Sequence, residues 1–266
     1  MKLTLPIVYL FSLFFLYSCT EKVEPKLDKT EERVVIEGLV STEADSSYVR
    51  ISRTASYFSN DEPPAIANAT VEVSDGNTVF PLSYKGDGYY FFQPSFRGEA
   101  GKTYKLSVSV DGATYSSEAV LYPMFEVDTN IVATYKPAEG FIPEGYAITY
   151  MSRDSRPEEI FTWFNFGKND TLESFRIIFT NSNTLKNQWV PFELPFFRPV
   201  AGDTVMMVFK TLGRPQADFF TALDNLNSGA PGPFRTPPAN PPSNIRGGAL
   251  GYFMATEVLR INKKIP

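Results

Sequence analysis

Hydrophobic and polar residues alternate through much of the first half of the chain. In the clearest case, Tyr104–Val110 (YKLSVSV), apolar residues occupy every second position and Lys or Ser the others. Because successive strand residues face opposite sides of a sheet, this pattern predicts a strand with one buried face. Shorter runs that favour strands lie at Arg33–Val40, Tyr48–Arg53, Ala69–Ser74, Thr78–Leu82 and Tyr89–Phe92. Short strands at this spacing predict a β-sandwich of immunoglobulin- or transthyretin-like type over residues 32–121.

A tight turn follows the clearest strand. Asp111 and Gly112 alone separate it from the next run, Ala113–Ser117. Both central residues of a type I′ turn need a positive φ angle, which Asp and Gly tolerate. The sequence therefore predicts a two-residue β-hairpin at this point.

The rest of the chain, residues 122–266, also favours strands but is less regular. Runs rich in β-branched and aromatic residues lie at Val127–Tyr135, Tyr146–Arg153, Ile160–Phe166, Phe175–Thr180, Thr204–Leu212 and Leu250–Ile261. No clean linker precedes them, and we place the boundary between the two parts near Tyr122-Pro123. The second part is therefore predicted to be a β-rich domain.

This second part is also expected to contain one helix, at about residues 215–227. Phe219, Leu223 and Leu226 would share one face of that helix, which would pack on a sheet. A proline-dense loop, residues 231–244 (PGPFRTPPANPPSN), follows the helix. Such a loop either covers a sheet edge or offers a stiff, extended segment for recognition.

The N-terminus begins with one lysine and an apolar run, Leu3–Leu16. These 14 residues are fewer than the about 20 that a membrane-spanning helix needs, and they suit the core of a signal peptide. The run ends at Leu16-Tyr17-Ser18-Cys19, which resembles the lipobox of bacterial lipoproteins. We expect a signal peptide over residues 1–18, lipid attachment at Cys19 and a polar tether over residues 19–31. The alternative is an ordinary export signal that is cleaved elsewhere, with an incidental cysteine.

Composition argues against several classes of function. The chain has no histidine and one cysteine, so His-based catalysis, an internal disulfide and Cys-based zinc binding are all excluded. Its net charge is −5 and it has no basic stripe, which argues against binding to nucleic acid. Glycine-rich nucleotide-binding motifs and the G-x-S-x-G motif are absent. The sequence thus predicts no catalytic residue, no cofactor and no metal ligand.

The densest charged cluster is Arg153–Glu159 (RDSRPEE). Neighbouring residues on a strand point to opposite faces, so Glu158 and Glu159 cannot face each other as the acid pair of a glycosidase. A solvent-exposed loop is the favoured interpretation. Oxygen ligands for a structural calcium, a minority alternative, occur in turns that lack the EF-hand spacing: Asp75-Gly76-Asn77, Asp87-Gly88 and Asn169-Asp170.

Aromatic residues are abundant, and two groups of them could be functional. Residues 161–166 (FTWFNF) are apolar on both faces of a strand, which predicts a sheet packed between two layers, although an exposed patch is the alternative. Trp189 and the pair Phe234-Arg235 lie in irregular, proline-flanked sequence. Because large aromatic and arginine side chains often anchor interfaces, we take Trp189, Phe234 and Arg235 as candidate contact residues.

Five stretches together carry a family resemblance: residues 34–58, 67–76 (ANATVEVSDG), 88–115, 202–212 (GDTVMMVFKTL) and 234–255. Their order and spacing resemble those of domain-of-unknown-function family 4249, a group of Bacteroidota cell-envelope lipoproteins. The resemblance implies an envelope lipoprotein that is often encoded beside TonB-dependent outer-membrane transporters. It implies no known activity. The first sandwich is also similar, at the level of fold alone, to carboxypeptidase-regulatory and transthyretin-like modules.

Three functions remain open, in decreasing order of support. The first is a non-catalytic outer-membrane lipoprotein that serves as an accessory binding component of a TonB-dependent transporter system. The second is a stand-alone glycan- or peptide-binding surface lipoprotein, and the third is an enzyme with carboxylate-only chemistry. In surface-displayed lipoproteins of this group acidic residues follow the cysteine, as Glu21 and Glu24 do here. We therefore expect display at the cell surface rather than in the periplasm.

Overall fold

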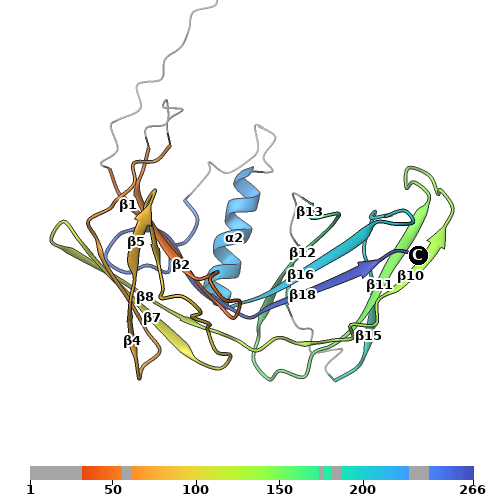
Figure 1. Ribbon diagram of the computed structural model, residues 1–266, viewed down its shortest axis with the longest axis horizontal. Coiled ribbons are helices and arrows are strands. Elements are labelled where there is room, and N and C mark those ends of the chain that lie inside the picture. The colour runs from red at the N-terminus through yellow and green to blue at the C-terminus, as the bar shows by residue number, and fades with distance from the viewer. Residues whose placement is uncertain (1–31, 56–61, 174–176, 181–186, 228–239) are drawn as a thin grey trace, which may run out of the picture. The chain divides into compact units, whose positions relative to one another are not determined.

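The computed structural model describes residues 32–55, 62–173, 177–180, 187–227 and 240–266. Within these ranges the chain forms four β-sheets and one helix, so the prediction of a mainly β fold is confirmed (Figure 1). Cys19, Phe234 and Arg235 lie outside the described residues. So do the predicted signal peptide and all of the tether, together with most of the proline-dense loop.

The first two sheets enclose one core. One sheet has the strand order β17-β1-β2-β6-β5, and the other has the order β4-β3-β7-β8. The strands are β1 (Val34–Ser41), β2 (Tyr48–Arg53), β3 (Thr70–Ser74), β4 (Val79–Pro81), β5 (Ser83–Gly86), β6 (Tyr89–Phe91), β7 (Thr103–Val110), β8 (Ala113–Val120) and β17 (Leu250–Thr256). Ile36 and Val49 of the first sheet share this core with Val73 and Val108 of the second, and all four are fully buried. The immunoglobulin- or transthyretin-like topology stays a prediction.

The hairpin between β7 and β8 has the predicted turn. Val110 pairs with Ala113, and the two residues between them have positive φ angles, 51° at Asp111 and 77° at Gly112. This is the conformation that a type I′ turn requires. The predicted two-residue β-hairpin is therefore confirmed.

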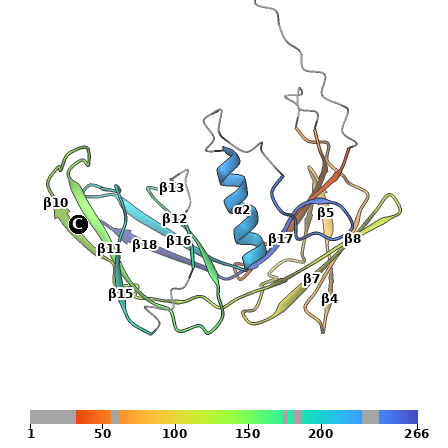
Figure 2. The same ribbon diagram turned by 180° about the vertical axis from the view of Figure 1, so that it is seen from behind.

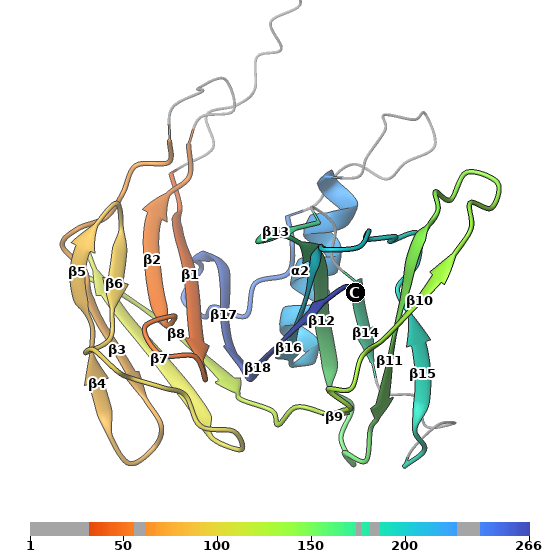
Figure 3. The same cartoon turned by 45° about the vertical axis from the view of Figure 1, so that its right-hand side comes forward.

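The other two sheets enclose a second core. One has the order β10-β11-β15, with β9 paired to β11, and the other has the order β13-β12-β16-β18, with β14 paired to β12 (Figure 3). The strands are β9 (Glu126–Val127), β10 (Val132–Lys136), β11 (Gly145–Arg153), β12 (Phe161–Lys168), β13 (Thr171–Leu172), β14 (Ile177–Thr180), β15 (Val190–Glu193), β16 (Thr204–Leu212) and β18 (Val258–Lys264). Ile148 and Tyr150 pack with Phe164, Phe166 and Phe209 between these sheets.

The final apolar run is not the single strand that the sequence predicts. β17 pairs in parallel with β1, whereas β18 pairs antiparallel with β16 of the other core. Glu257 separates them, and its backbone N–H donates to the Thr211 hydroxyl at 2.9 Å while its carbonyl accepts from the Thr211 N–H at 3.1 Å. The prediction of one strand over Leu250–Ile261 is wrong because these long-range bonds divide a run that is continuous in hydrophobicity.

The predicted helix is confirmed as α2 (Arg214–Asn227). The helix lies beside β12 and β17 (Figure 2). Phe219 and Phe220 bury one of its faces against Trp163 of β12 and Tyr252 of β17. The ring centroids of Trp163 and Phe220 are 4.7 Å apart. Since Phe164 and Phe166 fill the core on the other side, the sheet packs between two layers as the sequence predicts.

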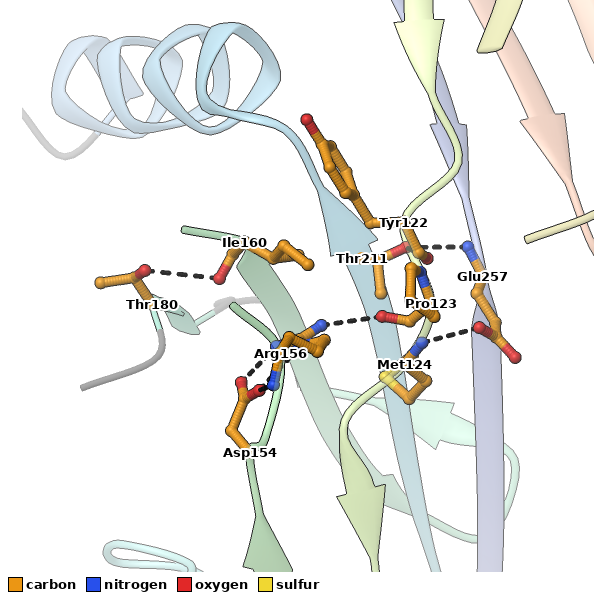
Figure 4. Close-up of polar contacts among 9 residues, drawn as sticks. All are labelled: Tyr122, Pro123, Met124, Asp154, Arg156, Ile160, Thr180, Thr211 and Glu257. Atoms are coloured by element: carbon orange, nitrogen blue, oxygen red, sulfur yellow. Dashed lines mark hydrogen bonds and ion pairs between the residues drawn. The ribbon is translucent and has the colours of Figure 1, made fainter. Parts of the chain in front are cut away.

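The segment that connects the two cores, Tyr122–Met124, is fixed by hydrogen bonds (Figure 4). The Thr211 hydroxyl donates to the Tyr122 carbonyl at 2.9 Å. The backbone N–H of Met124 donates to the Glu257 carboxylate at 2.7 Å. These contacts make the connecting segment part of the packed structure.

Arg156 holds the same segment and corrects one prediction. Only 7% of this residue is exposed, although the sequence favours a solvated loop over Arg153–Glu159. Its guanidinium donates to the Pro123 carbonyl at 2.9 Å, pairs with the Asp154 carboxylate at 2.5 Å and lies over the Phe125 ring. A buried arginine needs such partners because an unpaired charge is costly away from water. The solvated-loop interpretation is therefore wrong for Arg156.

Candidate contact surface

Trp189 is exposed, as the sequence predicts, with 44% of its surface accessible. It precedes β15, and the Arg153 guanidinium lies 5.1 Å from the centre of its indole ring. Arg153 in turn forms an ion pair with Glu126 of β9. This cation–π contact gives the ring a defined orientation without burying it. The role of Trp189 as a contact residue stays a prediction, as do those of Phe234 and Arg235.

Within the described ranges, two phenylalanines are more exposed than Trp189. Phe141 is 89% exposed and Phe196 is 68% exposed, and their rings stack with centroids 6.1 Å apart and an interplanar angle of 28°. Tyr135, near the end of β10, and Val200, in the connection between β15 and β16, are each more than half exposed. We call Tyr135, Phe141, Phe196 and Val200 the aromatic tip. It is formed where β10 turns into β11 and where β15 leads into β16 (Figure 1).

Phe141 owes its position to a tight turn in the β10–β11 hairpin. Glu139 and Ile142 exchange two backbone hydrogen bonds, of 3.0 and 2.9 Å, and enclose Gly140 and Phe141. Gly140 has a φ angle of 59°, which suits glycine. The phenylalanine is therefore carried at the apex of a closed loop.

Phe196 is held in a conformation that aromatic residues rarely adopt. Its φ angle is 56°, in the left-handed region. The residues around it are anchored, because Leu194, Phe197 and Pro199 are buried. Leu194 and Phe197 fill the core on either side, and the backbone between them carries the Phe196 ring outward. Backbone strain of this kind often occurs at functional sites.

Gly145 allows the two connections to approach each other. A Cβ atom at this position would lie 2.9 Å from the Pro199 carbonyl oxygen and 3.0 Å from the Arg198 carbonyl oxygen. Its φ angle of 149° is also unfavourable for other residues. The neighbouring Tyr146 N–H donates to the Pro199 carbonyl at 2.9 Å. Glycine at position 145 therefore permits the close approach of the β10–β11 hairpin, which carries Phe141, and the β15–β16 connection, which carries Phe196.

Asp203 closes the second connection. Its carboxylate accepts hydrogen bonds from the Val200 backbone N–H at 2.9 Å, the Asn169 amide at 2.7 Å and the Lys168 ammonium at 3.0 Å. These bonds, that of Val200 first, lower the pKa of Asp203 to about 2. The loop that carries Phe196 and Val200 is therefore fixed by a carboxylate that stays ionised at ordinary pH.

Charged residues border the aromatic tip. Glu193 forms ion pairs with Lys136 at 2.8 Å and Arg198 at 3.0 Å, and Lys136 holds the pKa of that carboxyl below its usual value. The Tyr135 hydroxyl donates to the Glu144 carboxylate at 2.9 Å, which raises the pKa of Tyr135. The result is an apolar centre with a polar rim, an organisation that is common in protein–protein interfaces.

The structure does not bring Trp189 together with this tip, and Phe234 and Arg235 lie outside the described residues. Trp189 and Phe196 lie at opposite ends of β15. The sequence argument that favoured Trp189, a large aromatic in proline-flanked sequence, also applies to Phe196 (PFFRP) and to Phe141 (GFIP). Those two residues were therefore within reach of sequence reasoning, but their stacking was not, because it depends on the contact between two distant connections.

The described ranges contain neither a metal-ligand cluster nor a helix that could span a membrane. No cluster of three or more Asp, Glu, Cys or His side chains there could hold a metal ion. Nor does any helix in those ranges combine the length and the apolar character needed to cross a membrane.

Similarity to known proteins identifies the family of the chain. No curated protein matches the chain. The model of the family described as "Domain of unknown function (DUF4249)" matches residues 20–261. Because this match covers most of the sequence, the chain belongs to the DUF4249 family.

Proposed function

We propose that this chain is a non-catalytic lipoprotein of the bacterial outer membrane that binds another envelope protein through the aromatic tip. The partner proposed is a TonB-dependent transporter, for which this protein is an accessory component. The observation that carries the proposal is the exposure of the stacked pair Phe141 and Phe196 at 89% and 68%. The other parts of the proposal rest on the sequence.

Exposed phenylalanines at the ends of rigid loops are unfavourable unless something covers them. Burying a Phe side chain contributes about 1.5–3 kcal/mol. Here both rings lie outside the second core, although other phenylalanines of the same connections, such as Phe197, are buried. A partner that covered the two rings would gain this apolar contact with little ordering cost, because Asp203 and Gly145 already fix the loops.

The envelope location rests on the N-terminal sequence. Cys19 is proposed as the lipid-attachment residue, and the lipid would hold the module at the outer membrane, facing the cell surface. The transporter as partner comes from the family resemblance. The non-catalytic part of the proposal rests on the absence of histidine and of nucleophile motifs from the sequence.

Site-specific photo-crosslinking in the native host tests the contact directly. A photoreactive phenylalanine analogue at position 141 should form an adduct with a transporter. The same analogue at Val79 provides the control, because Val79 is 56% exposed but belongs to β4 of the first core. An adduct of the same size and yield from both positions, or from neither, would count against the aromatic tip.

A further inference from the structure

A small cavity lies at the outer edge of the first core, away from the aromatic tip. Its volume is about 250 Å³, and its lining includes Asp45, Ser83, Lys85, Phe91, Gln93 and Phe96. Part of the lining comes from β5 and β6, and the loop between β1 and β2 contributes Asp45. β5 and β6 lie side by side (Figure 3). Nothing in the proposed function uses this cavity.

The apolar wall of the cavity is rigid. Phe92 and Phe96 stack with ring centroids 4.0 Å apart and an interplanar angle of 10°. Phe96 also contacts the ring of Phe80 edge to face, with centroids 5.0 Å apart. Phe92 is 9% exposed and belongs to the core. The wall is therefore preformed, as in most small-molecule sites.

A hydrogen bond to its side chain anchors Asp45, the residue that the β1–β2 loop contributes to the lining. The Ser95 N–H donates to the Asp45 carboxylate at 3.0 Å. Both residues have positive φ angles, 57° at Asp45 and 68° at Ser95. Asp45 is thus held by a hydrogen bond from a second residue in the left-handed region, a backbone conformation that costs energy and often occurs at functional sites.

Several polar groups at the cavity have no partner. In the described part of the chain, the side chains of Ser83, Lys85 and Gln93 make no hydrogen bond or ion pair, and all three are exposed. The Ser83 hydroxyl and the Gln93 amide can each donate and accept, and Lys85 can donate. Together with the apolar wall, they form the combination that small-molecule sites show: an apolar surface with a few polar groups.

We propose that this cavity binds one hydroxylated six-membered sugar ring. The aliphatic face of such a ring would lie on the phenylalanine wall. Its hydroxyls, which both donate and accept, would meet Ser83, Lys85 and Gln93. The volume of about 250 Å³ is below the roughly 300 Å³ at which small-molecule sites begin, so it suits a single ring or a terminal residue of a glycan.

A zwitterionic amino acid is the competing ligand, because Asp45 and Lys85 carry opposite charges. Both residues are exposed, and exposed ion pairs contribute little because water screens them. The two neutral groups, Ser83 and Gln93, instead match hydroxyls. The observations therefore favour the sugar.

The test measures ligand binding by saturation-transfer NMR and calorimetry on the mature chain without its lipid. The probes are the methyl glycosides of glucose, galactose, mannose and N-acetylglucosamine, with leucine as the zwitterion. We expect at least one glycoside to bind with a Kd of about 1 mM, an affinity typical of small ligands with few contacts. Gln93→Ala and Lys85→Ala should each weaken it about five-fold, the factor expected for the loss of one hydrogen bond.

Two controls isolate the cavity. Lys105→Ala removes an exposed lysine from β7 and should leave glycoside binding unchanged. Phe141→Ser with Phe196→Ser should leave it unchanged as well, which keeps this proposal separate from that of the aromatic tip. Binding of leucine alone, of no probe at all, or of a glycoside with the same Kd in the Gln93→Ala and Lys85→Ala variants would overturn the inference.

Discussion

At the scale of single residues, neighbours in the sequence have opposite environments. Phe196 is 68% exposed and Phe197 is 6% exposed. Hydrophobicity alone does not distinguish the two, because both are phenylalanine. The distinction comes from the positive φ angle at Phe196, which turns one ring outward while the next enters the core.

This difference predicts two different effects on stability. Phe197→Ala should lower the free energy of unfolding by about 3–5 kcal/mol, because it leaves a cavity in the second core. Phe196→Ala should lower it by about 1 kcal/mol or less, since it removes only the stacking contact with Phe141. Urea denaturation of both variants provides the measurement. Equal losses would show that Phe196 is a core residue and that the aromatic tip is wrongly assigned.

A second residue-scale prediction concerns pH. Hydrogen bonds lower the pKa of Asp203 from 3.8 to about 2 in the folded chain. Its ionised form therefore stabilises the fold fully above about pH 4. This contribution is lost as the pH falls toward 2. Urea denaturation between pH 2 and pH 4 should show that the free energy of unfolding depends less steeply on pH for Asp203→Asn than for the unmodified chain. If the free energies of unfolding of the two proteins changed in parallel with pH, the lowered pKa of Asp203 would be contradicted.

At the scale of elements, strong patterns in the sequence were reliable and weak ones were not. The alternation over Tyr104–Val110 and the Asp111-Gly112 turn gave β7, β8 and their hairpin. β5, β13 and β15 were not predicted, since they are short and their residues are mostly exposed. Their positions depend on pairing with β6, β12 and β11 rather than on their own pattern.

The connecting segment gives a prediction at this scale. Arg156→Ala should lower the free energy of unfolding by about 3 kcal/mol, because it removes a buried arginine and leaves Asp154 and the Pro123 carbonyl without this partner. Arg53→Ala is the matched control, since Arg53 pairs with Asp111 at the surface and should contribute about 1 kcal/mol or less. The solvated-loop interpretation predicts equal, small losses for the two variants.

At the scale of the whole molecule, the anchor and the folded part are expected to act separately. Glu32–Pro266 forms one structural unit, and the proposed lipid-attachment residue precedes it. Cys19→Ala should therefore move the protein from the membrane fraction to the soluble fraction with no change in melting temperature. Incorporation of labelled palmitate into the variant would show that another residue carries the lipid.

The candidate site was partly accessible from sequence. Trp189 was correctly expected to be exposed, because it lies between two polar residues, Asn187-Gln188, and Pro191. The aromatic tip required the structure, since stacking of Phe141 on Phe196 depends on Gly145 and on the close approach of two loops. The buried position of Arg156 also depends on the fold, because Pro123 and Phe125 lie far from it in sequence.

The most direct test of the proposed function is quantitative co-purification from the native host. Three lipidated forms would be compared at equal abundance: the unmodified chain, Phe141→Ser with Phe196→Ser, and Val79→Ser as the exposed control. Truncation of an interface anchor typically costs at least about 2 kcal/mol, or roughly a 30-fold loss of affinity. We predict that a TonB-dependent transporter is recovered with the unmodified and Val79→Ser forms and is lost with the double variant. Recovery of the transporter with the double variant at the level of the unmodified chain would contradict binding through the aromatic tip.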